Sequence, residues 1–390
     1  MNLLPRVAFK TGLTGMITGV MLAGTVMSAS IVHAQGLDTI AREAYLIDYQ
    51  TGTVLFEKNG YSLTEPASMT KMMTVYMLFD RLKNGSLSMT DTFHVSENAW
   101  RKGGSKMFVE VNSNVTVDDI LHGIIVQSGN DAAIVVAEAL NGTEEAFAVE
   151  MTKKAREIGM GDAVFKNATG WPDPEHLVTA HDLAILAQRT ISDFPELYKL
   201  YAEPVFTYNG IRQPNRNPLL GTSAGVDGLK TGHTESAGYG LTASAERDGR
   251  RLILVVNGLP SMRDRRTESQ KLLDWGFREF DNYNLFAKGE AASAADVWLG
   301  DEARVDLVTD QDIILTLPRR DRSDMKVSVI YEGPIPAPIT EGQQLATLKV
   351  EIPGLENHEF PLYAAKAVDR LGFFGRIGAA IQYLLWGANG

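Results

Sequence analysis

Apolar and polar residues alternate in short runs at both ends of the longer, N-terminal part of the chain. From Ala41 to Lys58 the alternation surrounds Gly52, which predicts a β-hairpin. Asp248-Gly249 is typical of a tight turn between two later runs. Together the later strand-like runs cover residues 226–234, 239–246 and 251–259.

Between these runs the apolar positions recur at three- and four-residue intervals, which predicts helices. The predicted helices cover residues 68–83, 117–126, 131–140 and 180–190, and helical periodicity returns at 268–280. Strands at both ends with helices between them indicate one α/β domain built on an antiparallel sheet. We expect this domain, 35–283, to close near Tyr283.

The pattern changes in the last quarter of the chain. Residues 287–296, AKGEAASAAD, have the composition of a linker. After them, short alternating runs such as VDLV, IILTL, KVSVIY and LATLKVEI are separated by Pro, Gly and Asp. This texture predicts a small all-β domain at 296–364.

The C-terminal tail, 366–390, is amphipathic. Its apolar residues share one face at helical spacing: Leu371, Phe374, Ile377, Gly378, Ile381, Leu384 and Leu385. The run is too short and too mixed to span a bilayer, but a cationic helix of this kind fits the membrane interface. The alternative is a terminal helix that packs on its own domain.

The first 34 residues have the pattern of a secretory signal peptide. Arg6 and Lys10 precede an apolar stretch, and Val32 and Ala34 occupy the small-residue positions before a cleavage site at Gln35. The alternative is an uncleaved N-terminal anchor. Either arrangement exports the rest of the chain.

Composition narrows the function. The chain of 390 residues has a net charge of −11, and removing the leader removes two cations and no acid, so nucleic acid is not an expected partner. There is no cysteine, which excludes disulfides, zinc–thiolate sites and cysteine catalysis. The seven histidines are scattered without ligand spacing, so we expect no metal and no cofactor.

A serine and a lysine three positions apart, Ser68 and Lys71, begin the first predicted helix. Positions i and i+3 share a helix face, so the amine can reach the hydroxyl, and the helix N-terminus favours negative charge there. Burial among methionines would lower the lysine pKa toward that of a base. The pattern alone is weak, because S-x-x-K occurs by chance roughly once per few hundred residues.

Two further motifs follow in order. Ser128-Gly129-Asn130 lies in a turn between two predicted helices, where Ser128 could relay a proton and Asn130 could bind a substrate amide. Lys230-Thr231-Gly232 lies on a predicted edge strand, where glycine allows close approach of a substrate backbone. Lys230 adds positive charge there, and Thr231 offers a hydroxyl to a carboxylate.

Each motif also has an ordinary structural interpretation: a helix cap at Ser68, a capping turn at Ser128, and solvated strand residues at Lys230. The presence of all three motifs in one chain favours a catalytic site. A second S-x-x-K, from Ser323 to Lys326, lacks the other motifs and lies in a predicted β region, where i and i+3 point to opposite sides.

The three motifs together resemble those of the penicillin-binding, active-site-serine D,D-peptidases. QSGNDAA (127–133), the segment 228–253, the β domain and the amphipathic tail are similar to the low-molecular-weight D-alanyl-D-alanine carboxypeptidases. The resemblance implies a β-lactamase/transpeptidase-like fold, with an antiparallel sheet flanked by helices and a helical subdomain. It also implies an enzyme of cell-wall biogenesis at the periplasmic face of the cytoplasmic membrane, held there by the tail.

The resemblance further implies roles for individual residues. Ser68 would attack the carbonyl between the two terminal D-alanines of a peptidoglycan stem peptide, or a β-lactam, with Lys71 as base and Ser128 as a third catalytic residue. The N–H groups of Ser68 and His233 would stabilise the oxyanion. The residues expected to bind the substrate are Asn130, Lys230, Thr231, Gly232, His233 and Arg216, the last as a partner of the terminal carboxylate.

Three alternatives stay open. A class A β-lactamase has S-D-N and an E-x-x-x-N segment, whereas this chain has Gly129 and no E-x-x-x-N between Asn130 and Lys230. An endopeptidase that cuts D-amino-acid cross-links has the same motifs, and the β domain and tail favour the carboxypeptidase. A non-catalytic wall-binding protein has no need for Lys71 beside Ser68.

Overall fold

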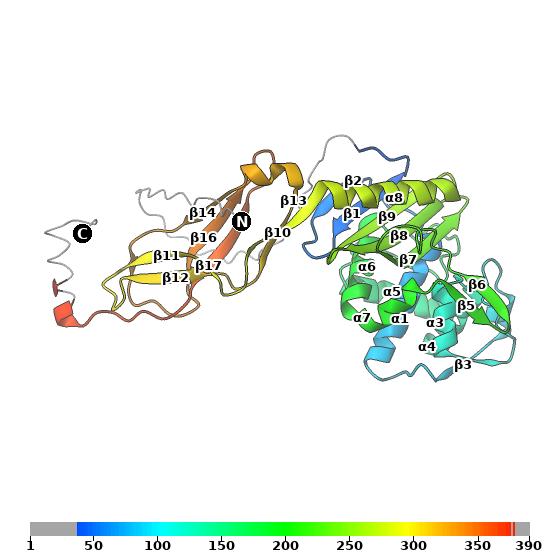
Figure 1. Ribbon diagram of the computed structural model, residues 1–390. Coiled ribbons are helices and arrows are strands. Elements are labelled where there is room, and N and C mark those ends of the chain that lie inside the picture. The colour runs from blue at the N-terminus through cyan, green and yellow to red at the C-terminus, as the bar shows by residue number, and fades with distance from the viewer. Residues whose placement is uncertain (1–36, 376, 379–390) are drawn as a thin grey trace. The chain divides into compact units, whose positions relative to one another are not determined.

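The structure is a computed structural model that describes residues 37–375, 377 and 378 (Figure 1). The described chain forms two compact units, which meet in sequence between Arg278 and Glu279. The predicted leader lies outside the described residues, as does the part of the tail at 376 and 379–390. Residues 373–375, 377 and 378 are helical, and no helix of the described chain is long and apolar enough to cross a membrane.

The N-terminal unit is built on a five-stranded antiparallel sheet in the order β2-β1-β9-β8-β7. Its strands are β1 (Glu43–Asp48), β2 (Val54–Lys58), β7 (Val226–Thr234), β8 (Gly238–Arg247) and β9 (Arg250–Leu259). The predicted hairpin and the three later strands are confirmed. Strand β7 lies at one edge, as the sequence predicted for the K-T-G segment.

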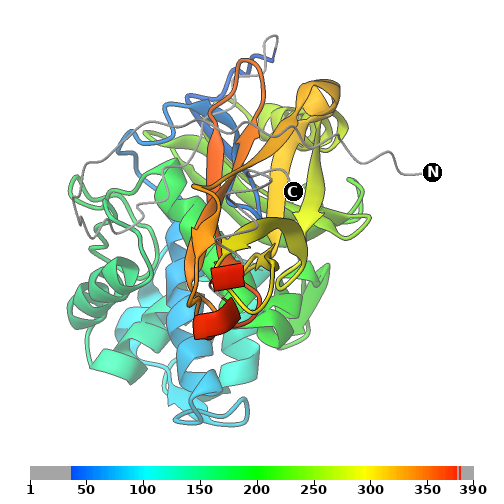
Figure 2. The same cartoon turned by 90° about the vertical axis from the view of Figure 1, so that its left-hand side faces the viewer.

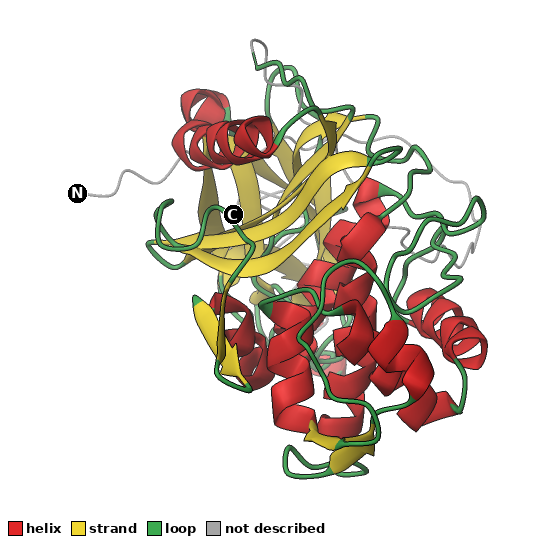
Figure 3. Cartoon of the chain, turned by 90° about the vertical axis from the view of Figure 1, so that its right-hand side faces the viewer, coloured by secondary structure: helices red, strands yellow, loops and turns green. Residues whose placement is uncertain are grey.

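Helices cover both faces of this sheet (Figure 3). On one face α8 packs closely, because a Cβ on Gly276 would lie 2.9 Å from side-chain atoms of Leu252 and Leu46. On the other face α6 packs against the central strands, and the start of α1 contacts the edge strand β7 (Figure 1). The α-helices are α1 (Lys71–Lys83), α2 (Glu97–Arg101), α3 (Val117–Ile125), α4 (Asn130–Asn141), α5 (Glu144–Glu157), α6 (Ala180–Asp193), α7 (Pro195–Tyr198) and α8 (Met262–Glu279).

The core of the N-terminal unit lies between the sheet and these helices. It includes buried methionines, valines and isoleucines of α1, α3 and α4, together with Ile253 and Val255 of β9. Short elements complete the unit: β3 (Thr92–His94) with β4 (Asn114–Thr116), β5 (Val205–Tyr208) with β6 (Ile211–Pro214), and the 3₁₀ helices η1 (Ala67–Thr70) and η2 (Lys199–Ala202). The five predicted helices are confirmed, although residues 68–70 form a 3₁₀ turn and the last helix begins at Met262 rather than at residue 268.

The C-terminal unit is β-rich, as predicted (Figure 2). Its six-stranded sheet has the order β14-β16-β17-β12-β11-β15, and β10 pairs separately with β13. The strands are β10 (Phe280–Phe286), β11 (Ala291–Trp298), β12 (Arg304–Val308), β13 (Ile313–Pro318), β14 (Lys326–Ile330), β15 (Ile335–Pro336), β16 (Gln344–Glu351) and β17 (His358–Ala364), with the 3₁₀ helix η3 (Arg319–Asp324).

Two sequence interpretations are wrong in this unit. The expected linker contains β11, whose alanines pair with β12 and include the fully buried Ala295, so small residues here reflect tight packing. The segment around Ser323 begins in η3 and enters β14 only at Lys326, because the charged run before it forms a 3₁₀ turn.

Candidate active site

Ser68 lies in the 3₁₀ turn η1, directly before α1. Side chains at i and i+3 eclipse in a 3₁₀ helix, and Nζ of Lys71 is 3.1 Å from Oγ of Ser68. Ala67, the residue before the serine, has a φ of +46°, a left-handed conformation that is uncommon for a residue with a side chain. The predicted Ser–Lys contact therefore exists, within a tight turn rather than a regular α-helix.

Lys71 is completely buried. Loss of hydration disfavours the charged ammonium, and the positive charge of Arg216 adds to this effect, so the pKa of Lys71 falls from 10.5 to about 7. Besides Ser68, the amine contacts the backbone carbonyl of Thr169 at 2.6 Å. Burial thus makes this lysine a base that is partly neutral near pH 7.

The segment 167–171, here called the Thr169 loop, is folded around one side chain. Oδ1 of Asn167 accepts hydrogen bonds from the N–H groups of Thr169, Gly170 and Trp171. Gly170 has a φ of +78°, and a Cβ there would lie 1.7 Å from the carbonyl oxygen of Ala67. The loop is therefore pressed against the turn that carries Ser68.

Gly170→Ala is expected to destabilise the protein by about 3 kcal/mol or more, because it adds a backbone clash to the cost of a positive φ. The matched control is Gly142→Ala, where φ is +80° but no atom lies within 4 Å of the added Cβ. That control should cost only about 1 to 2 kcal/mol. Urea denaturation compares the two variants, and equal losses would show that the close contact with Ala67 does not matter.

Ser128 and Asn130 lie at the turn between α3 and α4, as predicted. Ser128 has a φ of +65°, and its hydroxyl is buried with no hydrogen-bond partner among the described residues. The side-chain amide of Asn130 donates to the carbonyl of Gly103 at 2.8 Å, and its backbone N–H donates to the carbonyl of Ser105. This turn therefore also holds the segment 103–105 beside the serine.

Asp131, which the sequence interpretation did not single out, fixes the adjoining segment. Its buried carboxylate accepts hydrogen bonds from the N–H groups of Met107, Phe108 and Val109. In the sequence, an acid in the first turn of α4 is explained by its favourable interaction with the helix dipole. Only the contacts of Asp131 with distant residues show that it also fixes this segment.

The edge strand β7 brings Lys230, Thr231, Gly232 and His233 to the same site. A Cβ on Gly232 would lie 2.8 Å from the carbonyl oxygen of Pro66, so glycine is needed for close packing of β7 on the serine turn. Lys230 is buried, and burial lowers its pKa well below the usual value. The ring of His233 lies 3.9 Å from that of Tyr239, centroid to centroid.

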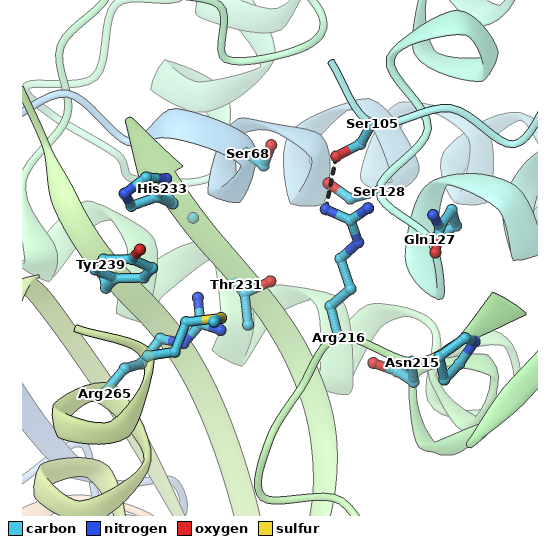
Figure 4. A pocket seen from close by; sticks show the side chains of 13 residues that line it. Ser68, Ser105, Gln127, Ser128, Asn215, Arg216, Thr231, His233, Tyr239 and Arg265 are labelled. Carbon is cyan, nitrogen blue, oxygen red and sulfur yellow. Dashed lines mark hydrogen bonds between the residues drawn. The ribbon is translucent and has the colours of Figure 1, made fainter. Parts of the chain in front are cut away.

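A cleft of about 670 Å³ opens at the junction of these elements (Figure 4). Of the predicted residues, Ser68, Ser128, Arg216, Thr231, Gly232 and His233 line it, while Lys71, Asn130 and Lys230 do not. The remaining lining residues are Ser105, Gln127, Pro214, Asn215, Tyr239, Met262 and Arg265. The cleft thus brings together residues from each of the three motifs, which lie far apart in the sequence.

Two guanidinium groups enter the cleft from different elements (Figure 4). Arg216, in the loop after β6, donates from Nη1 to Oγ of Ser105 at 2.6 Å. Arg265, on α8, is buried, and its Nε has no hydrogen-bond partner within the described chain. The sequence interpretation missed Arg265, because it is one of several arginines at the polar start of α8 and nothing local distinguishes it.

The site is therefore cationic within an acidic protein. Burial lowers the pKa of Arg216 and of Arg265, and the charges of Lys71, Arg216 and Arg265 all act on Lys230. Desolvated cations gathered in one cleft favour an anionic ligand. Among residues 37–375, 377 and 378, no cluster of His, Asp or Glu suits a metal ion.

Comparison with known proteins agrees with this geometry. Residues 28–261 match the family described as D-alanyl-D-alanine carboxypeptidase, peptidase S11, and residues 280–370 match the C-terminal domain of penicillin-binding protein 5. The chain is 38% identical over 351 residues to the D-alanyl-D-alanine carboxypeptidase DacA of Escherichia coli strain K12, covering 88% of this chain and 87% of that protein.

Solved structures give the same result. Penicillin-binding protein 5 from Haemophilus influenzae has a TM-score of 0.78 at 36% identity, covering 87% of this chain and 100% of that chain. Penicillin-binding protein D2 from Listeria monocytogenes, solved with ampicillin bound, has a TM-score of 0.58 at 29% identity, covering 63% and 100%. The chain therefore belongs to the peptidase S11 family: it is a serine D-alanyl-D-alanine carboxypeptidase, homologous to the penicillin-binding proteins.

Proposed function

We propose that the protein removes the terminal D-alanine from peptidoglycan stem pentapeptides through an acyl-enzyme on Ser68, and that β-lactams acylate the same residue. The observation that carries this proposal is the 3.1 Å contact between the buried Lys71 amine and the Ser68 hydroxyl at the edge of the cleft. A desolvated amine with a pKa of about 7 can take the serine proton at neutral pH.

In the proposed reaction, Oγ of Ser68 attacks the carbonyl of the penultimate D-alanine as Lys71 takes its proton. The N–H groups of Ser68 and His233 stabilise the oxyanion. The amide bond then breaks, and the amine of the leaving D-alanine takes a proton through Ser128, whose buried hydroxyl has no hydrogen-bond partner in the part of the chain that the structure describes. Water hydrolyses the ester and restores Ser68.

The terminal carboxylate of the substrate is proposed to lie between Arg216, Arg265 and the hydroxyl of Thr231. All three residues line the cleft, and Lys230 adds positive charge behind them. Asn130 is proposed to bind the substrate amide, and Gly232 keeps β7 close to Ser68. Because Arg265 is buried and no other described residue binds its Nε, an anion there recovers part of the cost of burial.

A pentapeptide with an amidated C-terminus is expected to lose about 100-fold in kcat/KM relative to the free acid, because the two guanidinium groups are left without their anion. Release of D-alanine, or of its amide, measures this ratio. In the Arg265→Leu variant the ratio of kcat/KM between the free-acid and the amidated pentapeptide should be smaller, because the free-acid pentapeptide is cleaved more slowly. A cross-linked muropeptide dimer cleaved faster than the pentapeptide would instead favour the endopeptidase alternative.

We further propose that the chain is an exported cell-wall enzyme with a leader at 1–34, a catalytic domain that ends near residue 278, a β domain that begins near residue 280 and an interfacial helix at 366–390. The exposed Phe373 and Phe374 support an apolar contact at the start of the tail. Deleting 366–390 should move the enzyme from the membrane fraction to the soluble fraction without loss of penicillin binding. Unchanged partitioning would contradict this proposal.

A further inference from the structure

Glu144, the first residue of α5, is a mostly buried acid to which the mechanism above gives no role. Its side chain is only 15% exposed. One carboxylate oxygen, Oε1, accepts a hydrogen bond from the N–H of Ala168 at 3.0 Å. The other, Oε2, lies 3.8 Å from Nζ of Lys102. Burial raises the pKa of Glu144, so the carboxylate is kept here at an energetic cost.

The first contact leads to the Lys71 amine. Ala168 is fixed on both sides of its backbone, since its N–H binds Glu144 and its carbonyl accepts the hydroxyl of Thr74 at 2.7 Å. The next carbonyl along the chain, that of Thr169, accepts the 2.6 Å hydrogen bond from Lys71. Any displacement of Ala168 therefore moves the acceptor that orients the amine.

The second contact leads to the opposite segment of the cleft. Nζ of Lys102 lies 5.0 Å from the ring centroid of Trp171, the last residue of the Thr169 loop. The residue after Lys102, Gly103, provides the carbonyl that Asn130 binds. A single carboxylate thus links the Thr169 loop to the segment that holds Asn130.

We propose that Glu144 is a positioning residue for acylation, which holds the Thr169 carbonyl against Lys71 by fixing Ala168 and Lys102. The inference rests on the proposed role of Lys71 as the base. Glu144 lies outside the residues that line the cleft, and its contacts are with Ala168 and Lys102, so it positions the amine through the backbone of the loop and through Lys102.

Charge gives a second, independent readout. The charged groups that act on Lys71 are Arg216 and Lys102, which lower its pKa, and Asp131 and Glu144, which raise it. Lys71 in turn acts on Lys230 and His176, both buried. Removing the negative charge of Glu144 therefore lowers the pKa of Lys71 further, so the amine stays neutral to lower pH.

The test compares three variants of the full chain: Glu144→Gln, Glu144→Ala and, as the matched control, Glu145→Gln at the exposed neighbouring position. The rate constant for acylation by a labelled penicillin is measured from pH 5 to 9. Glutamine keeps an oxygen for the Ala168 N–H, so its plateau rate should stay within about threefold of the wild type, whereas alanine should lose about tenfold. At low pH the acylation rate falls as Lys71 is protonated, and this part of the pH profile is here called the acid limb. In both variants the acid limb should move to lower pH, by about half a unit.

Three results would overturn the inference. Glu144→Ala could reach the same plateau rate as the wild type, Glu144→Gln could have a plateau as low as that of Glu144→Ala, or the acid limb could stay in place. Thermal unfolding of the same variants tests for a purely structural role. In that case the melting temperature would fall while the acid limb of the acylation rate stayed in place. Failure of the wild type and of Glu145→Gln to acylate would instead contradict the proposed function itself, so the two failures are distinguishable.

Discussion

The Ser68→Ala variant is expected to lose covalent labelling by penicillin and release of D-alanine by at least about 10⁴-fold, because the variant lacks the hydroxyl on which the proposed acyl-enzyme forms. The serine lies in a turn that places its hydroxyl 3.1 Å from a buried amine, and the cleft residues converge on it. Peptide mass spectrometry of the labelled wild type should find one adduct, on the peptide that contains Ser68. Alanine in this 3₁₀ turn removes only the hydroxyl, so the melting temperature should change little.

The chain contains its own control for this experiment. Ser323 also precedes a lysine by three positions, but it lies in η3 of the C-terminal unit, outside the residues that line the cleft. Ser323→Ala should therefore label as the wild type does. An adduct that persists in Ser68→Ala, or that maps to another serine, would disprove the assignment of the nucleophile.

The parts of the site that the sequence predicted are those carried by local patterns. The i, i+3 spacing of Ser68 and Lys71 predicts their contact whichever helix type forms, and the turn at Ser128 follows from two helical runs that stop and restart. The K-T-G segment was predictable as an edge strand for a similar reason. For Gly232 the sequence suggested room for a substrate backbone, while the structure adds a second reason, its contact with Pro66.

The parts that sequence could not predict depend on contacts between distant segments. Asp131 and Glu144 each occupy the first turn of a helix, where acids are favourable in any protein, and only the fold supplies Met107 and Ala168 as their partners. Likewise, the Thr169 loop shows no catalytic motif, although its carbonyl binds Lys71. The expected linker failed for the related reason that alanines suit both loose segments and tightly packed strands.

Lys71→Arg is expected to reduce the acylation rate by about 10³-fold or more at every pH from 6 to 9. Arginine keeps the positive charge but does not release its proton in this range, so no base is left to activate Ser68. In the proposed mechanism the base is the neutral amine of Lys71, whose pKa is about 7. Acylation should therefore be constant above pH 8 and fall about tenfold per unit well below pH 7.

The matched control for this prediction is Lys83→Arg, at the exposed end of the same helix, which should leave both the acylation rate and its acid limb unchanged.

The pH dependence of stability gives an independent check on the pKa of Lys71. An unfolded lysine titrates near 10.4, so between about pH 7 and 10 the unfolded chain binds the proton that folded Lys71 has lost. This group therefore makes the free energy of unfolding increase with pH across that window, and the neutral variant Lys71→Met should remove that contribution. A wild-type acid limb near pH 5, or a pH dependence of stability that Lys71→Met does not change, would show that Lys71 is not the titrating base.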